Sequence, residues 1–122
     1  MPKAASNDVL DGSLNVVRTA NRMVALAAEP ASFAAANTGK LAEATLTTTD
    51  FTLAAGDVSG RKVTIAAKTS LPVLAAGTAN HIALLDTATS RLLYVTTCPA
   101  QGLVTGGVVS IAPWNIEIAA PV

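Results

Sequence analysis

The residues best suited to catalysis are a single histidine and a single cysteine. His81 begins an apolar segment, and the nearest following carboxylate, Asp86, lies five residues further on. A histidine base needs a partner that orients its ring. In a strand, residues five apart point to opposite faces, so Asp86 is not placed to orient His81. We therefore predict a structural or hydrogen-bonding role for His81.

Cys98 has no charged sequence neighbour that would favour its thiolate. It follows Thr97 and precedes Pro99 and Ala100, whereas reactive cysteines lie beside basic groups or at helix N-termini. We predict that Cys98 is a small packed residue. A lone cysteine also forms no internal disulfide, so packing alone must hold the fold, and a reducing cytoplasm is the expected place of synthesis.

The sequence offers no ligand set for a metal or a phosphate. One histidine and one cysteine are too few for a four-ligand zinc site. The aspartates lack the dense alternation of a calcium loop and are scattered along the chain as Asp8, Asp11, Asp50, Asp57 and Asp86. Residues 56–62 (GDVSGRK) lack the spacing of a phosphate-binding loop and predict a turn that leads into a strand. We predict no catalytic residue, no metal site and no cofactor, and hence no enzyme.

Composition describes a stable but weakly charged domain. The 122 residues are 51% hydrophobic and 13% charged, with eight basic and eight acidic residues, 25 alanines and 15 threonines. Zero net charge argues against a basic nucleic-acid surface, and four aromatic residues are too few for both a core and a base-stacking platform. The low charge indicates that other subunits cover part of the surface, although it also suits an Ala/Thr-rich domain that binds nothing.

Neither a signal segment nor a membrane span is expected. Residues 1–8 (MPKAASND) lack an apolar core. The longest uncharged stretch, residues 92–116, contains two prolines, three glycines and many polar residues, which disfavour a lipid-facing helix. Length predicts one domain over residues 1–122.

One helix is predicted at the N-terminus, over residues 8–18, after an arm of residues 1–7. Apolar residues at helical spacing mark one face of this segment: Val9, Leu10, Leu14 and Val17. Ser6, Asn7 or Asp8 can cap its start. Gly12 inside the segment costs about 1 kcal/mol relative to alanine, which predicts a short, docked helix.

The remaining chain, residues 22–119, has the pattern of short β-strands. Strands are predicted at 22–28, 45–49, 51–53 and 61–67, at 71–74 with an irregular or edge character, and at 81–86, 91–97, Val108–Ile111 and Trp114–Ile118. Residues 87–90 have the length of a hairpin turn, and the last two strands are expected to pair with each other. Residues 31–40 favour neither a helix nor a loop. The pattern predicts a mainly β fold: a β-sandwich or a jelly-roll-like barrel of about 7–8 short antiparallel strands.

Five segments resemble a group of small proteins encoded among the structural genes of tailed bacteriophages. They keep their order over almost the whole chain: residues 8–11 (DVLD), 57–66 (DVSGRKVTIA), 77–86 (GTANHIALLD), 92–98 (LLYVTTC) and 114–118 (WNIEI). The resemblance implies a virion component whose partners are other virion proteins, and it brings no catalytic residues.

Three functions follow as hypotheses. The first is a non-enzymatic, homo-oligomeric protein of the virion, preferably a decoration or cement protein on the capsid. The second places the same kind of protein in the tail, in an adaptor or at a fibre base. The third is a small module that binds a glycan or host-surface ligand through loops 31–40, 54–60, 86–91 and 99–107. None of these functions requires nucleic acid or a membrane.

Overall fold

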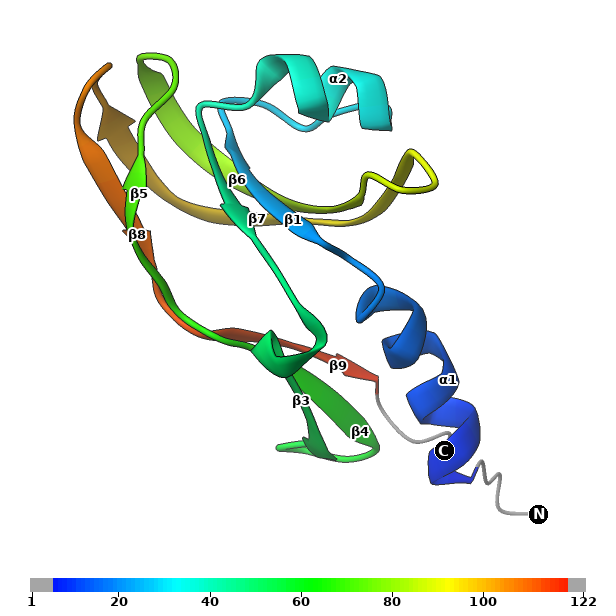
Figure 1. Ribbon diagram of the computed structural model, residues 1–122. Coiled ribbons are helices and arrows are strands. Elements are labelled where there is room, and N and C mark those ends of the chain that lie inside the picture. The colour runs from blue at the N-terminus through cyan, green and yellow to red at the C-terminus, as the bar shows by residue number, and fades with distance from the viewer. Residues whose placement is uncertain (1–5, 119–122) are drawn as a thin grey trace.

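The computed structural model describes residues 6–118, which form two packed layers of antiparallel strands (Figure 1). These residues contain two α-helices and nine strands: α1 (Asn7–Val17), β1 (Arg22–Leu26), α2 (Phe33–Gly39), β2 (Ala42–Thr45), β3 (Phe51–Ala55), β4 (Arg61–Ile65), β5 (Lys68–Pro72), β6 (Gly77–Asp86), β7 (Arg91–Leu103), β8 (Val108–Ile111) and β9 (Trp114–Ile118). The large sheet has the order β2-β1-β6-β7, the small sheet has the order β3-β4-β9, and β5 pairs with β8. The predicted mainly β sandwich is confirmed, and within residues 6–118 the strands do not close into a barrel.

Strands β4 to β9 are the two arms of one long hairpin. Their antiparallel partners follow a single sequence of pairs: Arg61–Ile118, Ile65–Trp114, Lys68–Ile111, Pro72–Val108, Gly77–Leu103 and Asp86–Arg91. Residues 61–86 therefore lie against residues 91–118. The hairpin is folded over, so that β6 and β7 join the large sheet, β4 and β9 join the small sheet, and β5 and β8 connect the layers (Figure 1).

The long hairpin bends where its ladder is interrupted. Pro113 separates β8 from β9 and has no N–H to donate to a ladder. On β7, three residues separate Thr97 from Gln101, whereas one residue separates their partners His81 and Ala79, so residues 98–100 bulge. Bulges bend a strand and increase its twist, so β7 is bent at residues 98–100.

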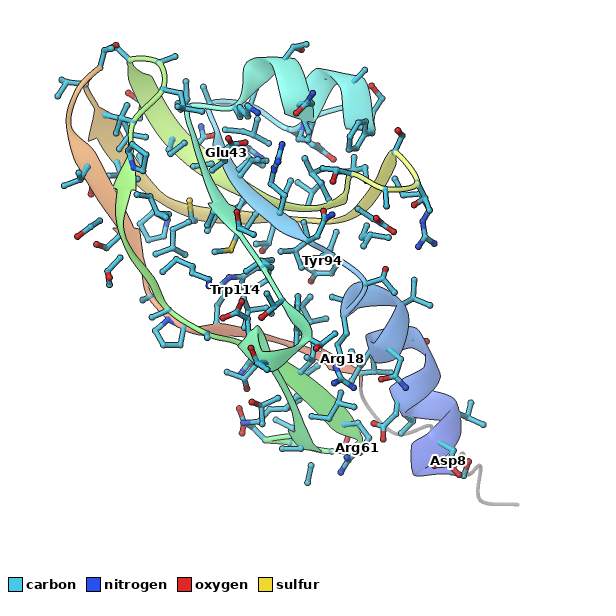
Figure 2. The ribbon with its side chains drawn as sticks, viewed as in Figure 1. Asp8, Arg18, Glu43, Arg61, Tyr94 and Trp114 are labelled. Atoms are coloured by element: carbon cyan, nitrogen blue, oxygen red, sulfur yellow. The ribbon has the colours of Figure 1, made fainter. Side chains whose placement is uncertain are left out.

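An inner core fills the space between the two layers. We use this name for the buried residues Leu14, Ala20, Met23, Ala44, Leu46, Phe51, Val63, Ile65, Ile82, Leu84 and Ile116. They come from α1, from both sheets and from the connections between them. Tyr94 and Trp114 pack against this core from β7 and β9, and Figure 2 shows both rings between the layers.

The opposite face of the large sheet is buried as well. Helix α2 begins after Ser32, whose hydroxyl accepts a hydrogen bond from the Ala35 amide at 3.2 Å. Its residues join an outer core, made by Val24, Leu26, Phe33, Ala36, Ala83, Leu85, Leu92 and Val95. Burial on both faces explains why β1 and the second half of β6 are continuous apolar runs instead of alternating ones.

Helix α1 docks on the small sheet through one apolar face and one ion pair. The Ser6 hydroxyl caps it by accepting a hydrogen bond from the Val9 amide at 3.3 Å. Leu14 is fully buried in the inner core. On β4, Arg61 Nε lies 2.9 Å from Asp11 Oδ1, which ties the helix to the strand.

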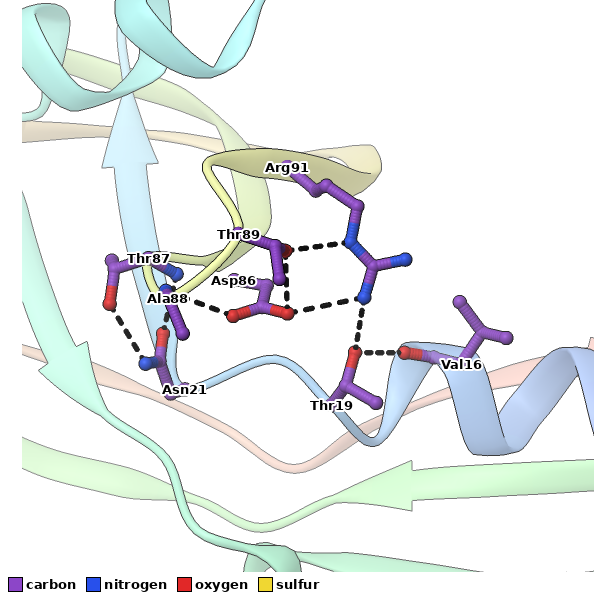
Figure 3. A network of polar contacts seen from close by, with 8 residues as sticks. All are labelled: Val16, Thr19, Asn21, Asp86, Thr87, Ala88, Thr89 and Arg91. Carbon is purple, nitrogen blue, oxygen red and sulfur yellow. Dashed lines mark hydrogen bonds and ion pairs between the residues drawn. The ribbon is translucent and has the colours of Figure 1, made fainter.

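A network of polar contacts joins the exit of α1 to the turn of the long hairpin (Figure 3). Asp86 accepts hydrogen bonds from the Ala88 amide at 3.0 Å and from the Thr89 hydroxyl at 2.9 Å. Arg91 Nη2 lies 3.2 Å from Asp86 and 3.3 Å from the Thr19 hydroxyl. The network fixes the predicted four-residue turn, 87–90, against the segment between α1 and β1.

Several predictions about individual elements need correction. The described residues contain nine strands instead of about seven or eight, and residues 31–40 contain the second helix, α2. Strands β1 and β4 are shorter than predicted, whereas β2 and β5 begin and end earlier than the predicted segments 45–49 and 71–74. Residues 45–49 are not a strand, because β2 ends at Thr45 and a 3-10 turn covers Thr48–Asp50. In that turn the Asp50 carboxylate accepts a hydrogen bond from the Thr47 amide at 2.8 Å, a local contact that competes with strand pairing.

The predicted pairing of the last two strands was wrong. Strand β8 pairs with β5 and β9 pairs with β4, because both belong to the same arm of the long hairpin. The helix predicted over 8–18 is confirmed with bounds Asn7–Val17, so Asn7 belongs to the helix and not to the arm. Residues 1–5 of the predicted arm and residue 119 of the predicted β region lie outside the described residues.

Candidate functional site

The histidine and the cysteine lie on different faces of the large sheet. His81 pairs with Thr97 across β6 and β7, and its Nδ1 lies 2.6 Å from Asn80 Oδ1. Its neighbour Ile82 belongs to the inner core, so the His81 side chain projects from the other face. Cys98 instead packs against the inner core. The two residues therefore form no nucleophile–base pair.

Cys98 is a packed thiol, as predicted. Burial raises the pKa of the Cys98 thiol above its ordinary value. A raised pKa keeps the Cys98 thiol protonated at neutral pH. Because the thiolate is the reactive form of a cysteine, Cys98 is less reactive than a free cysteine.

Four of the five aspartates that were considered as ligands are engaged by cations. The ion pairs are Asp11–Arg61, Asp50–Lys68, Asp57–Lys62 and Asp86–Arg91. Within the described part of the chain, no three His, Cys, Asp or Glu side chains are grouped so as to hold a metal ion. These carboxylates serve to join elements of the fold.

Hydrogen-bond partners lower the pKa of two of these carboxyls, Asp50 and Asp86. Burial raises the pKa of Asp50, but hydrogen bonds from Thr47 and Lys68 outweigh it and hold the pKa below the ordinary value. Hydrogen bonds from Thr89 and Arg91 likewise lower the pKa of Asp86. Both groups are therefore ionised and paired at neutral pH.

The glycine-containing segment 56–62 is the turn between β3 and β4, as predicted. The Gly56 amide donates to the Gly60 carbonyl at 2.9 Å, and Gly60 has a φ of 71°, a value that favours glycine. The segment leads into β4 and not into a helix, so it does not make a phosphate-binding loop.

An apolar groove opens between two strand edges on one side of the sandwich. One wall is β7 around Cys98 and Pro99, and the other is β8 and β9 around Ile111 and Trp114. Ile82 of β6 also lines it, and the groove has a volume of about 460 Å³. A smaller hollow of about 180 Å³ adjoins it and shares Ile82, Cys98, Pro99 and Ile111. We call the groove and its two walls the open side.

Both walls of the open side are free strand edges. In residues 6–118, β7 pairs only with β6, β8 only with β5, and β9 only with β4. The outward N–H and C=O groups of such strands are available to another chain. The bulge at residues 98–100 and the exposed Pro99 shorten the regular part of the β7 edge.

Two aromatic rings, Tyr94 and Trp114, lie near each other between the layers, and Trp114 also lines the groove (Figure 2). The ring centroids of Tyr94 and Trp114 lie 6.0 Å apart, with an angle of 32° between the planes. The indole Nε1 of Trp114 is buried and has no hydrogen-bond partner among the described residues. An unpaired buried donor costs about 1–3 kcal/mol, so packing and not hydrogen bonding holds this contact.

The open side carries no charged side chain. Residues 69–85 and 92–116 contain no Asp, Glu, Lys or Arg, and together they span most of β5 to β9. Charged residues lie elsewhere: Asp8, Arg18 and Arg61, labelled in Figure 2, are at the α1 end. Glu43 of β2 pairs with Arg22 and Lys40 away from α1, and Lys68 of β5 pairs with Asp50. The uncharged part of the molecule therefore consists of residues 69–85 and 92–116 of the folded hairpin.

Exposed apolar residues extend the uncharged part to the bend of the hairpin. Leu74 is 46% exposed, and Val104 and Val108 are each 68% exposed. The Val73 amide donates to the Gly107 carbonyl at 3.0 Å, which brings the two turns together. Neighbouring apolar side chains of this kind mark a surface suited to contact with another protein.

The loops predicted for a glycan site do not meet at one end of the molecule. Residues 31–40 cover the outer face of the large sheet, whereas residues 54–60 lie at the far end of the small sheet (Figure 1). The sequence did contain the signal for the open side, the uncharged stretch 92–116. Within residues 6–118 neither helix has the length and hydropathy to cross a membrane.

Comparisons with known proteins add no family. No family model matches the chain, and neither the curated proteins nor the solved structures gave a match.

Proposed function

We propose that this chain is a non-enzymatic structural protein of a tailed-bacteriophage virion, attached to the capsid surface as a decoration or cement protein. The observation that carries the proposal is the open side, with its apolar groove, two free strand edges and no charged residue. The centres of protein interfaces are depleted of charge in the same way.

The ion pairs support this role, because they stabilise the fold of the single subunit. Their carboxylates pair with cations that join α1, the turns and the strands, as Asp11 does with Arg61 and Asp86 with Arg91. A subunit repeated many times on a symmetric shell needs a stable fold and a contact surface. The resemblance of five sequence segments to phage structural proteins supports the same role.

Purified particles of the encoding phage provide the test. Gold-labelled antibodies against this protein should cover the heads in electron micrographs, and quantitative mass spectrometry should count hundreds of copies per particle. Label confined to the tail, with about a dozen copies, would instead support the tail, adaptor or fibre-base position. Infectious particles that carry no label would refute the virion role.

The capsid position has a separate biochemical test. Purified protein should bind assembled shells saturably and should not bind the free major capsid protein, because a decoration site is completed only by assembly. Absence of saturable binding to shells would refute attachment to the capsid while leaving a tail position open to the labelling experiment.

A further inference from the structure

We propose that residues 1–5 of one copy of this chain bind a pocket beside α2 of a neighbouring copy, with Lys3 paired to Glu29. We call this site the α2 pocket and define it by its lining residues, 26–31, Ala35 and Gly39. It shares no lining residue with the groove of the open side. The inference therefore goes beyond attachment to a shell and concerns the contact between neighbouring copies.

The α2 pocket has the chemistry of a site for an extended peptide. Its volume of about 420 Å³ is within the usual range of ligand sites, roughly 300–1,000 Å³. Apart from Glu29, its lining residues are leucine, proline, alanine and glycine, and most of them are small enough for another backbone to approach closely. Within residues 6–118, the backbone N–H and C=O groups of residues 27–31 make no hydrogen bond, so they are available to a bound peptide.

Charge identifies the segment that fits this pocket. Glu29 is exposed and takes part in no ion pair among residues 6–118. Six of the seven basic side chains in the same residues pair with a carboxylate, and the seventh, Arg18, donates a hydrogen bond to Asn15 Oδ1 at 3.0 Å. The eighth basic residue of the chain is Lys3, in residues 1–5 (MPKAA). A lysine has an aliphatic stem that suits an apolar wall and an ammonium group that suits the Glu29 carboxylate.

Distance requires that the segment comes from another copy. Helix α1 has eleven residues and β1 has five, so each is about 16 Å long. They follow one another between Ser6 and Leu26, and Figure 1 shows the start of α1 and helix α2 at opposite ends of the molecule. The three residues from Ser6 back to Lys3 span at most about 11 Å. Lys3 therefore cannot reach Glu29 of its own copy.

The contact joins two different surfaces, so it continues from copy to copy. Each copy gives its segment to one neighbour and receives the segment of another. Contacts of this head-to-tail kind close into a ring when the rotation between copies closes. They connect neighbouring subunits and leave the open side available for attachment to a shell.

The first test is zero-length crosslinking of the purified full chain at about 200 µM, because a contact made by one short segment is weak. A carbodiimide joins a lysine amine to a carboxylate in direct contact, with loss of water, and mass spectrometry of the digested product identifies the two residues. In an equal mixture of unlabelled and isotope-labelled protein, a crosslink between copies joins labelled to unlabelled peptides. We expect such a crosslink between Lys3 and Glu29.

The second test exchanges the two charges and measures association by sedimentation velocity. Glu29→Lys places two cations together, and we expect it to weaken association at least about fivefold. The double variant Lys3→Glu with Glu29→Lys restores opposite charges at unchanged net charge, so it should associate like the wild type. Thr52→Lys is the control for added charge, because Thr52 is exposed on β3 and does not line the α2 pocket.

Three results would overturn the inference: no crosslink between Lys3 and Glu29, a crosslink made only within single copies, or a double variant that associates as weakly as Glu29→Lys. Particle labelling and shell binding do not depend on this contact. A chain that labels the heads but gives no such crosslink would therefore refute the contact between copies and retain the virion role.

Discussion

Leu84 and Leu85 allow a sharp test of the two-sided burial of the large sheet. They are neighbours in β6 and both are fully buried, at 0% exposure, but Leu84 belongs to the inner core and Leu85 to the outer core with α2. In a sheet with one solvated face, only one of two consecutive residues would be buried. The structure therefore predicts that both are equally sensitive to truncation.

Each leucine-to-alanine substitution removes the equivalent of about three methylene groups, or about 2.4 kcal/mol at about 0.8 kcal/mol per group. The cavity left behind raises the expected loss to about 3 kcal/mol for each variant. Urea unfolding followed by Trp114 fluorescence measures it, and with a slope of about 1.5 kcal/mol per M each midpoint should fall by about 2 M. Val108→Ala is the control, because Val108 is 68% exposed and should cost less than about 0.5 kcal/mol.

The outcome that refutes the reasoning is an asymmetric one. If Leu84→Ala costs about 3 kcal/mol and Leu85→Ala less than about 1 kcal/mol, α2 does not cover the sheet and the outer core is not a core.

Three further predictions use the same unfolding measurement or a simple reaction. Gly12→Ala should stabilise the protein by about 1 kcal/mol, because Gly12 lies inside α1 and an added Cβ meets no atom within 4 Å; a loss of stability would contradict this. Because the pKa of Asp86 is lowered in the folded state, its stabilisation is present above the ordinary value and is lost as pH falls through the folded pKa. The free energy of unfolding of the wild type should therefore exceed that of Asp86→Asn at neutral pH, and this excess should disappear between about pH 5 and pH 2. An excess that does not change with pH would contradict the lowered pKa of Asp86. Cys98 should react with a disulfide reagent at least about tenfold more slowly than free cysteine, and at the free rate in denaturant; equal rates without denaturant would contradict the raised pKa.

Local patterns in the sequence were sufficient for much of the fold. Helical spacing of Leu10 and Leu14 located α1, and the four residues between Asp86 and Arg91 located the hairpin turn. These signals depend on neighbours in sequence. The structure agrees with them because the local preference and the packing favour the same conformation.

Other elements depend on contacts that the sequence pattern does not reveal. The threonines at 47–49 favour a strand by their β-branched side chains, but the Asp50 carboxylate binds the Thr47 amide and closes a turn. Residues 33–39 become a helix where Phe33 and Ala36 cover a sheet formed by distant segments. The pairing of Trp114 with Ile65 joins residues far apart in the chain, so no local pattern could assign it.

The open side was the part least accessible to sequence reasoning. Its walls are separate strands that do not pair with each other, and the groove exists only because Pro99 and Ile111 face one another after folding. The uncharged stretches were visible, but their meeting on one side of the molecule was not.

The continuity of the long hairpin sets an order for folding. The turn at residues 87–90 closes the shortest loop, and each later pair toward Arg61–Ile118 adds only a short extension to a ladder already formed. Closing the distant pairs first would cost more chain entropy, because the penalty grows with loop length. Strand pairing should therefore begin at Asp86 and Arg91 and extend toward Arg61 and Ile118. Destabilising substitutions near Asp86 should slow folding, whereas destabilising substitutions near Ile118 should mainly speed unfolding.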